Sequence, residues 1–120
     1  MSLGVSERRM DDVVVLELSG RLTLGPDCAA LDQRVEELGT AGTRAVLLHC
    51  EKLSAIDSQG IKLLVQATSR LREQGGRLTL CALPARVREV LQITRLLEVL
   101  ETFPSEAEAL ASFKPARGAA

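Results

Sequence analysis

A single polar turn carries the side chains with the clearest chemical potential in this chain of 120 residues. Asp57 and Ser58 stand together after an apolar run and before a helical pattern, and Gln59 and Gly60 follow them. Both Asp and Ser side chains accept hydrogen bonds from the first free N–H groups of a helix, which predicts a helix cap. A phosphate on the serine would also be favoured there, at the positive end of the helix dipole. Capping and phosphorylation are therefore compatible interpretations of this turn.

Enzyme chemistry finds little support elsewhere in the chain. The serine elbow of hydrolases reads Gly-x-Ser-x-Gly, and here Gly60 matches while Ile56 occupies the first glycine position. His49, the one histidine, lies inside an apolar strand-like run, where a packed core or edge residue is the commoner role. No His, Cys and carboxylate set has metal-ligand spacing, and residues 39–43 lack the Gly-Lys-Ser/Thr ending of a phosphate loop. We expect no catalytic residue, no metal and no cofactor.

Composition argues against two further classes of function. Lys plus Arg is 15 and Asp plus Glu is 16, so the net charge of −1 gives no basic excess for nucleic acid. Phe103 and Phe113 are the only aromatic residues, which leaves almost no platform for stacking bases. No stretch approaches the roughly 20 apolar residues of a membrane span, and residues 1–12 hold no apolar run of a signal peptide.

The cysteines point to a reducing compartment. Their number is three, and their spacing excludes a zinc or redox motif; they are Cys28, Cys50 and Cys81. We expect three small buried hydrophobic residues, and a cytoplasmic location.

The elements that must position the Asp-Ser turn alternate between strands and helices. Apolar and β-branched runs predict strands over residues 13–18, 44–50, 77–83 and 99–103, with an additional strand near residues 5–9. Apolar residues at helical spacing predict helices that begin near Pro26, Asp57, Pro84 and Ser105.

Local signals give the ends of these helices. Gly39 is expected to cap the first helix in the left-handed conformation, and Gly75 with Gly76 to end the second. Ser105 and Glu108 form a capping box at the start of the last helix.

This order predicts one α/β domain over residues 1–113, with right-handed crossovers and a flexible tail over residues 114–120. The sheet should be mixed and mostly parallel, with four to five strands and about four helices. Sites in such sheets lie beyond the carboxyl ends of the strands, and the connection at residues 54–60 is the most polar there.

The ordered set of segments resembles the STAS domain family, and more narrowly the bacterial anti-sigma factor antagonists. The resemblance covers about residues 13–113 and agrees with the order of elements. The segments that carry it are Ile56-Asp57-Ser58-Gln59-Gly60-Ile61 and residues 75–80, 84–91, 93–94 and 105–110.

The resemblance implies a binding protein that is switched by phosphorylation. Ser58 would be phosphorylated by an anti-sigma factor that is also a serine kinase, a GHKL-type ATPase. The unmodified protein would bind that partner and free a sigma factor, phosphorylation would break the complex, and a PP2C-type phosphatase would restore it. The implied partner-binding residues are Thr23, Leu24, Asp57, Ser58, Gln59, Gly60 and Lys62.

The sequence departs from the family pattern beside the implied phosphosite. Thr23 follows Gly20-Arg21-Leu22 where many antagonists carry an Asp, and Gln59 and Lys62 replace a second Ser and a second Gly. These changes leave open a different kinase or a STAS scaffold that is never phosphorylated, such as a stressosome-like or lipid-transport accessory protein. A small serine hydrolase is the third alternative, and a weak homo-oligomer is left open.

Lys62 lies four residues after Ser58, one helical turn along the chain. It would either pair with a phosphate on Ser58 or stand as a solvated surface charge.

Overall fold

The computed structural model describes residues 3–113, whose strands form one five-stranded sheet in the order β1-β2-β3-β4-β5. The strands are β1 (Leu3–Met10), β2 (Val13–Leu22), β3 (Ala45–Ile56), β4 (Arg77–Cys81) and β5 (Glu101–Phe103). β1 pairs with β2 in antiparallel fashion, and all later pairings are parallel. The predicted mixed, mostly parallel sheet is confirmed, including its additional N-terminal strand.

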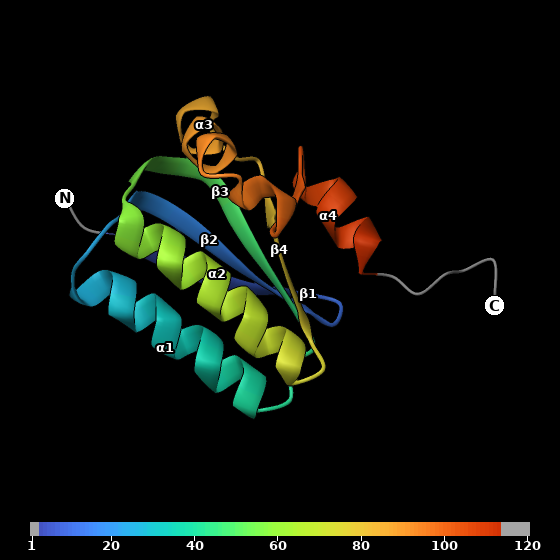
Figure 1. Cartoon of the computed structure of the whole chain (residues 1–120). Helices are drawn as coiled ribbons and strands as arrows, with labels where there is room; N and C mark the ends of the chain where they lie inside the picture. Colours follow the sequence, from blue (N-terminus) through green and yellow to red (C-terminus); the bar gives the residue numbers. More distant parts are fainter. Residues whose placement is uncertain (1–2, 114–120) are drawn as a thin grey trace.

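Helices connect these strands and cover both faces of the sheet. They are α1 (Pro26–Thr40), α2 (Ser58–Glu73), α3 (Ala85–Ile93) and α4 (Glu106–Ser112), with a short 3-10 turn η1 (Leu96–Glu98) after α3. Figure 1 shows α1 and α2 lying side by side in front of the sheet, with α3 near its upper end and α4 beyond β4. Among residues 3–113 no helix is long and apolar enough to cross a bilayer. The predicted tail, residues 114–120, lies outside the described residues.

Alternation along the strands divides the buried residues between two cores. Val14, Leu16 and Leu18 of β2 point into the larger core, together with apolar residues of α1, α2 and α3. Val13 and Val15 point the other way, into a smaller core that Ala109 of α4 completes. This alternation with a period of two is typical of a strand that is covered on both faces. The three cysteines are buried and free, as expected.

β2 and β3 are longer than the sequence predicts. The sequence predicts strands that end at residues 18 and 50, but β2 continues to Leu22 and β3 continues to Ile56. Gly20 has a positive φ of 94°, and the pairing register shifts beside it, between Gly20 and Arg21. The irregular, partly exposed ends of both strands therefore lack the simple alternation that marks a strand in sequence.

The expected role of Gly39 is wrong. This residue lies inside α1, which ends at Thr40, and the left-handed conformation belongs to Gly42 with φ 97°. A Cβ on Gly39 would lie 2.1 Å from the Gln74 side-chain oxygen and 3.2 Å from a methyl carbon of Leu71. Gly39 therefore lies where α1 packs against side chains at the end of α2, and it does not form a turn.

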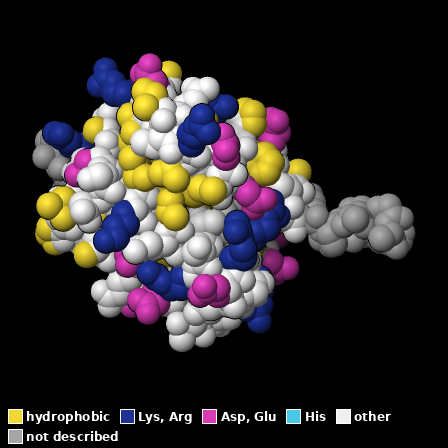
Figure 2. Space-filling model, in the orientation of Figure 1, with side chains coloured by type: hydrophobic (Ala, Val, Ile, Leu, Met, Phe, Trp, Pro, Cys, Tyr) yellow, Lys and Arg dark blue, Asp and Glu magenta, His cyan; other side chains and the backbone are white. Residues whose placement is uncertain are grey.

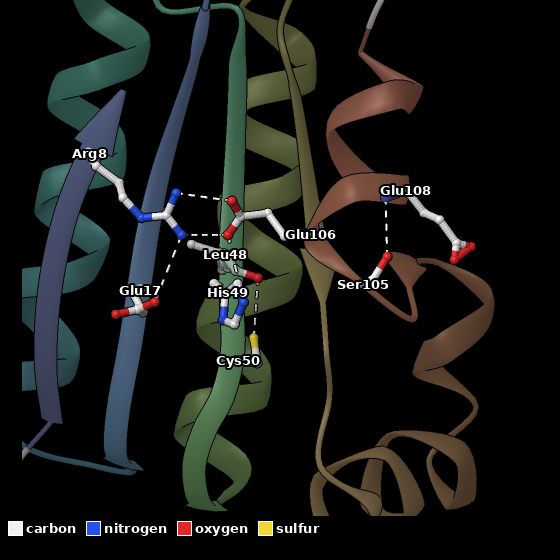
Figure 3. Close-up of polar contacts among 8 residues, drawn as sticks. All are labelled: Arg8, Glu17, Leu48, His49, Cys50, Ser105, Glu106 and Glu108. Atoms are coloured by element: carbon white, nitrogen blue, oxygen red, sulfur yellow. Dashed lines mark hydrogen bonds and ion pairs between the residues drawn. The ribbon is translucent and has the colours of Figure 1, made fainter. Parts of the chain in front are cut away.

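Charged side chains connect α4 to the second face of the sheet (Figure 3). The Arg8 guanidinium of β1 donates to both carboxylate oxygens of Glu106, at 3.0 and 2.5 Å. Glu17 of β2 lies 3.8 Å from Arg8, and His49 Nε2 of β3 lies 3.7 Å from Glu106. We call these four residues, Arg8, Glu17, His49 and Glu106, the α4 clasp.

Candidate functional site

Helix α2 begins at Ser58, and the preceding Asp57 caps it. Asp57 Oδ1 accepts hydrogen bonds from the backbone N–H groups of Gln59 and Gly60, each at 3.0 Å. The predicted helix cap is confirmed, and it assigns the two polar residues different places. Asp57 is the N-cap, while Ser58 is the first residue of a helix of 16 residues and is exposed. The cap therefore leaves the Ser58 hydroxyl at the surface.

Asp57 also binds the loop between β2 and α1. Its second oxygen, Oδ2, accepts the backbone N–H of Leu24 at 2.9 Å, and its own N–H donates to the Leu22 carbonyl at 3.3 Å. These N–H donors, that of Leu24 first, lower the pKa of Asp57 below its ordinary value. One ionised carboxylate thus fixes the Leu24 loop against the start of α2.

Gly60 allows the first turn of α2 to approach the end of β2. A Cβ at this position would lie 2.2 Å from the Leu22 carbonyl oxygen and 2.8 Å from Cγ1 of Ile56. Real Cβ atoms do not approach backbone oxygens so closely, so a larger residue would push the helix away. The glycine is explained by packing, without the hydrolase elbow that it partly matches.

The structure gathers most of the residues that the sequence singled out. Ser58, Gln59 and Lys62 are exposed, Thr23 is half-buried, and Gly60 is buried. Leu24, in the connection between β2 and α1, is 75% exposed despite its apolar side chain. Leu24, Gln59 and Lys62 line one groove between the starts of α1 and α2, and Thr23 is not part of its lining.

Sequence reasoning missed what α1 adds to this groove. α1 contributes Cys28, Ala29 and Asp32 to the lining, with its N-cap Gly25, and α2 contributes Leu63 and Gln66 as well. The only feature of the sequence that could indicate this lining is the position of α1. It starts directly after the Leu24 loop, so its first two turns lie beside the groove.

His49 does not join this site. Its side chain is 13% exposed and lies on the face that α4 covers, within 3.7 Å of Glu106. It is a strand residue of the α4 clasp, in agreement with the prediction of a packed core or edge histidine. In the part of the chain that the structure describes, no set of His, Cys, Asp and Glu side chains could hold a metal ion.

Comparisons with known proteins agree with this architecture. The STAS domain model matches residues 6–109. BtrV of Bordetella bronchiseptica, which is named as an anti-sigma factor antagonist, is 36% identical over 75 residues. That match covers 62% of this chain and spans 65% of the length of the relative.

Solved structures share the fold. A Thermotoga maritima protein described as an anti-sigma factor antagonist, TM1081, superposes with a TM-score of 0.83 at 22% identity, over 90% of this chain and 92% of that one. The Bacillus cell fate determinant SpoIIAA in its phosphorylated form gives a TM-score of 0.72 at 21% identity, over 92% of this chain and 100% of that one. With a family model that matches nearly all of residues 3–113, this chain belongs to the STAS domain family.

Proposed function

We propose that this protein is an anti-sigma factor antagonist, a cytoplasmic binding protein whose partner is an anti-sigma factor with serine kinase activity of the GHKL type. The observation that carries the proposal is the exposed Ser58 at the start of α2, directly after the Asp57 cap and beside the exposed Leu24. The name of the Bordetella relative supports the same class of protein. The protein would be the substrate of the kinase and would have no catalysis of its own.

The geometry explains how one phosphate would act as a switch. Phosphorylation adds about −1.5 to −2 charges at neutral pH. The start of α2 tolerates this charge within the domain because its helix dipole is positive there. Asp57 is ionised beside it, so negative charge would be concentrated at the contact with the partner, where repulsion and desolvation weaken binding.

Lys62 would stabilise the modified state. It lies one turn after Ser58 on the same helix and is exposed. Residues four apart on a helix are neighbours, so its ammonium group can reach a phosphate on Ser58. A PP2C-type phosphatase would then remove that phosphate and restore binding.

Intact mass measures the modification directly. The protein is incubated with ATP and the purified anti-sigma factor kinase of its source organism, and we expect a gain of one phosphate. Ser58→Ala should abolish the gain, whereas Ser69→Ala, at an exposed serine near the other end of α2, should not. In a binding assay with the same kinase, Ser58→Ala should bind and Ser58→Asp should not, and equal binding by both would contradict the switch.

A STAS scaffold that is never phosphorylated is the second candidate. Thr23 favours it, because this position lacks the carboxylate that many antagonists carry in the same loop. Absence of any mass gain, together with equal partner binding by Ser58→Ala and Ser58→Asp, would support the scaffold instead.

A further inference from the structure

The groove between α1 and α2 has a buried floor and an exposed rim. Cys28 and Leu63 form the floor and are 7% and 4% exposed. Leu24 and Ala29 are exposed on one side of the rim, and Lys62 is exposed on the other. Figure 2 shows the face that carries α1 and α2, on which hydrophobic and charged side chains both reach the surface.

The size of this groove selects the kind of occupant. Its volume is about 210 Å³, below the roughly 300–1,000 Å³ of pockets that enclose drug-sized ligands. An apolar floor of this size suits one large apolar side chain from another protein. Burying such a side chain completely contributes about 1.5–3 kcal/mol, enough to make it an anchor of an interface.

The charges on the rim of the groove indicate which residues of the partner would flank that apolar side chain. Asp32 is already paired with Arg70, at 3.1 Å between Oδ1 and Nη1. Lys62 has no carboxylate within ion-pair distance among residues 3–113. The rim therefore offers a cation and no unpaired anion, which complements an apolar side chain flanked by Asp or Glu.

The Leu24 loop joins this groove to the phosphosite. Asp57 accepts the Leu24 N–H at 2.9 Å while it caps the helix that Ser58 begins. Leu24, a rim residue of the groove, is thus fixed by the residue that precedes Ser58. A partner that contacts Ser58 would meet the groove in the same approach.

We infer that the groove binds one apolar side chain of the anti-sigma factor, and that Lys62 changes its partner on phosphorylation. In the unmodified protein Lys62 pairs with a carboxylate beside that side chain. In the modified protein it pairs with the phosphate on Ser58, so the anti-sigma factor loses its counter-ion and also meets added negative charge. This inference rests on the proposed function and adds the chemistry of the partner segment and a route for its release.

Two neighbouring alanines on α1 test the groove. Both are exposed, but Ala29 lines the groove and Ala30 does not. Binding to the purified anti-sigma factor kinase with ADP is measured by calorimetry for Ala29→Phe and Ala30→Phe. We expect Ala29→Phe to weaken binding by about tenfold or more and Ala30→Phe by less than about twofold. Thermal melting of both variants checks that each is folded.

A second pair of variants tests Lys62. Lys62→Gln should weaken binding of the unmodified protein by about threefold to tenfold, whereas Arg72→Gln, at an exposed position in the last turn of α2, should not. The ratio of affinities before and after phosphorylation should also be smaller in Lys62→Gln than in the wild type, because the exchange of partners is lost.

The outcomes separate this inference from the proposed function. If the wild type binds no anti-sigma factor, the proposed function fails. If the wild type binds and Ala29→Phe behaves like Ala30→Phe, the groove is not the binding site and the proposed function stands. If Lys62→Gln leaves both affinities as in Arg72→Gln, the exchange of partners by Lys62 is excluded.

Discussion

Two carboxylates in this molecule are held ionised in different ways. Asp57 at the start of α2 is surrounded by backbone N–H groups, with the Leu24 N–H as the largest cause of its lowered pKa. Glu106 at the start of α4 owes its lowered pKa first to the hydrogen-bonded Arg8 side chain, 98 residues away in sequence. The first arrangement depends on the main chain and the second on flexible side chains.

This difference separates a region that is accessible to other molecules, at the start of α2, from a region that stabilises the fold, at the α4 clasp. The backbone donors around Asp57 are rigid, and they leave the neighbouring Ser58 hydroxyl and the Lys62 ammonium exposed for other molecules. In the α4 clasp, Arg8 has carboxylates on two sides and His49 faces one of them. The clasp therefore has few polar groups left for a partner, and it stabilises the position of α4.

Gly60→Ala should lower the free energy of unfolding most, because it disrupts the close contact between the start of α2, where Asp57 is the cap, and the end of β2. The added Cβ would meet the Leu22 carbonyl oxygen at 2.2 Å, so the helix or the strand end must move. We expect about 1–3 kcal/mol lower free energy of unfolding by urea denaturation. Ser69→Ala on the same helix should stay within about 0.5 kcal/mol, and an equal effect of the two would argue against the tight contact.

Asp57→Ala should come next. It removes the acceptor for the N–H groups of Leu24, Gln59 and Gly60, and helix caps typically contribute about 0.5–2 kcal/mol. Ser105→Ala at α4 removes one cap hydrogen bond of 3.2 Å and should cost about half as much or less. If Ser105→Ala lowered the free energy of unfolding more than Asp57→Ala in urea denaturation, Asp57 would not be the more stabilising of the two helix caps.

Glu106→Gln should cost less again, about 0.2–1 kcal/mol, because the Arg8 and Glu106 side chains are 39% and 22% exposed. The dependence on salt concentration distinguishes the ion pair of Glu106 from the backbone hydrogen bonds of Asp57. In about 1 M NaCl the difference between wild type and Glu106→Gln should shrink, since exposed ion pairs are screened. The difference between wild type and Asp57→Ala should persist, because its hydrogen bonds are short-range contacts with the backbone.

Acidification should produce the smallest difference between the two regions. The pKa values of Asp57 and Glu106 are both lowered by folding, so each carboxylate contributes stability above its unfolded pKa and loses it as the pH falls through its folded pKa. Thermal melting should therefore show lower stability below about pH 4. On acidification, the Glu106→Gln variant should lose less thermal stability than the wild type. Parallel pH profiles of the two proteins would exclude a contribution from Glu106.

Features that depend on residues close together in the sequence could be predicted from it. The Asp57 cap, the buried cysteines and the alternating faces of β2 depend on local patterns of polarity, and the structure confirms them. The order of strands and helices follows from the same patterns.

Features that depend on distant packing could not be predicted. Gly39 is predicted from the sequence to be a turn residue, because its packing against Leu71 and Gln74 at the end of α2 leaves no local signal. The α4 clasp joins β1, β2, β3 and α4, and its charges look like ordinary surface residues in the sequence. The groove beside Ser58 exists only once α1 and α2 are packed together.

β1 has a consequence for how copies of this protein behave at high concentration. β1 is one of the two outer strands of the sheet, with β5 at the other edge, and the outer side of such a strand can template aggregation with the strand of another molecule. Glu7, Arg8 and Arg9 occupy its middle and end, and Arg34 of α1 holds Glu7 through two hydrogen bonds of 2.8 Å. Charged side chains on an edge strand disfavour its pairing with a second copy, so β1, which completes one side of the sheet, also limits fibrous association.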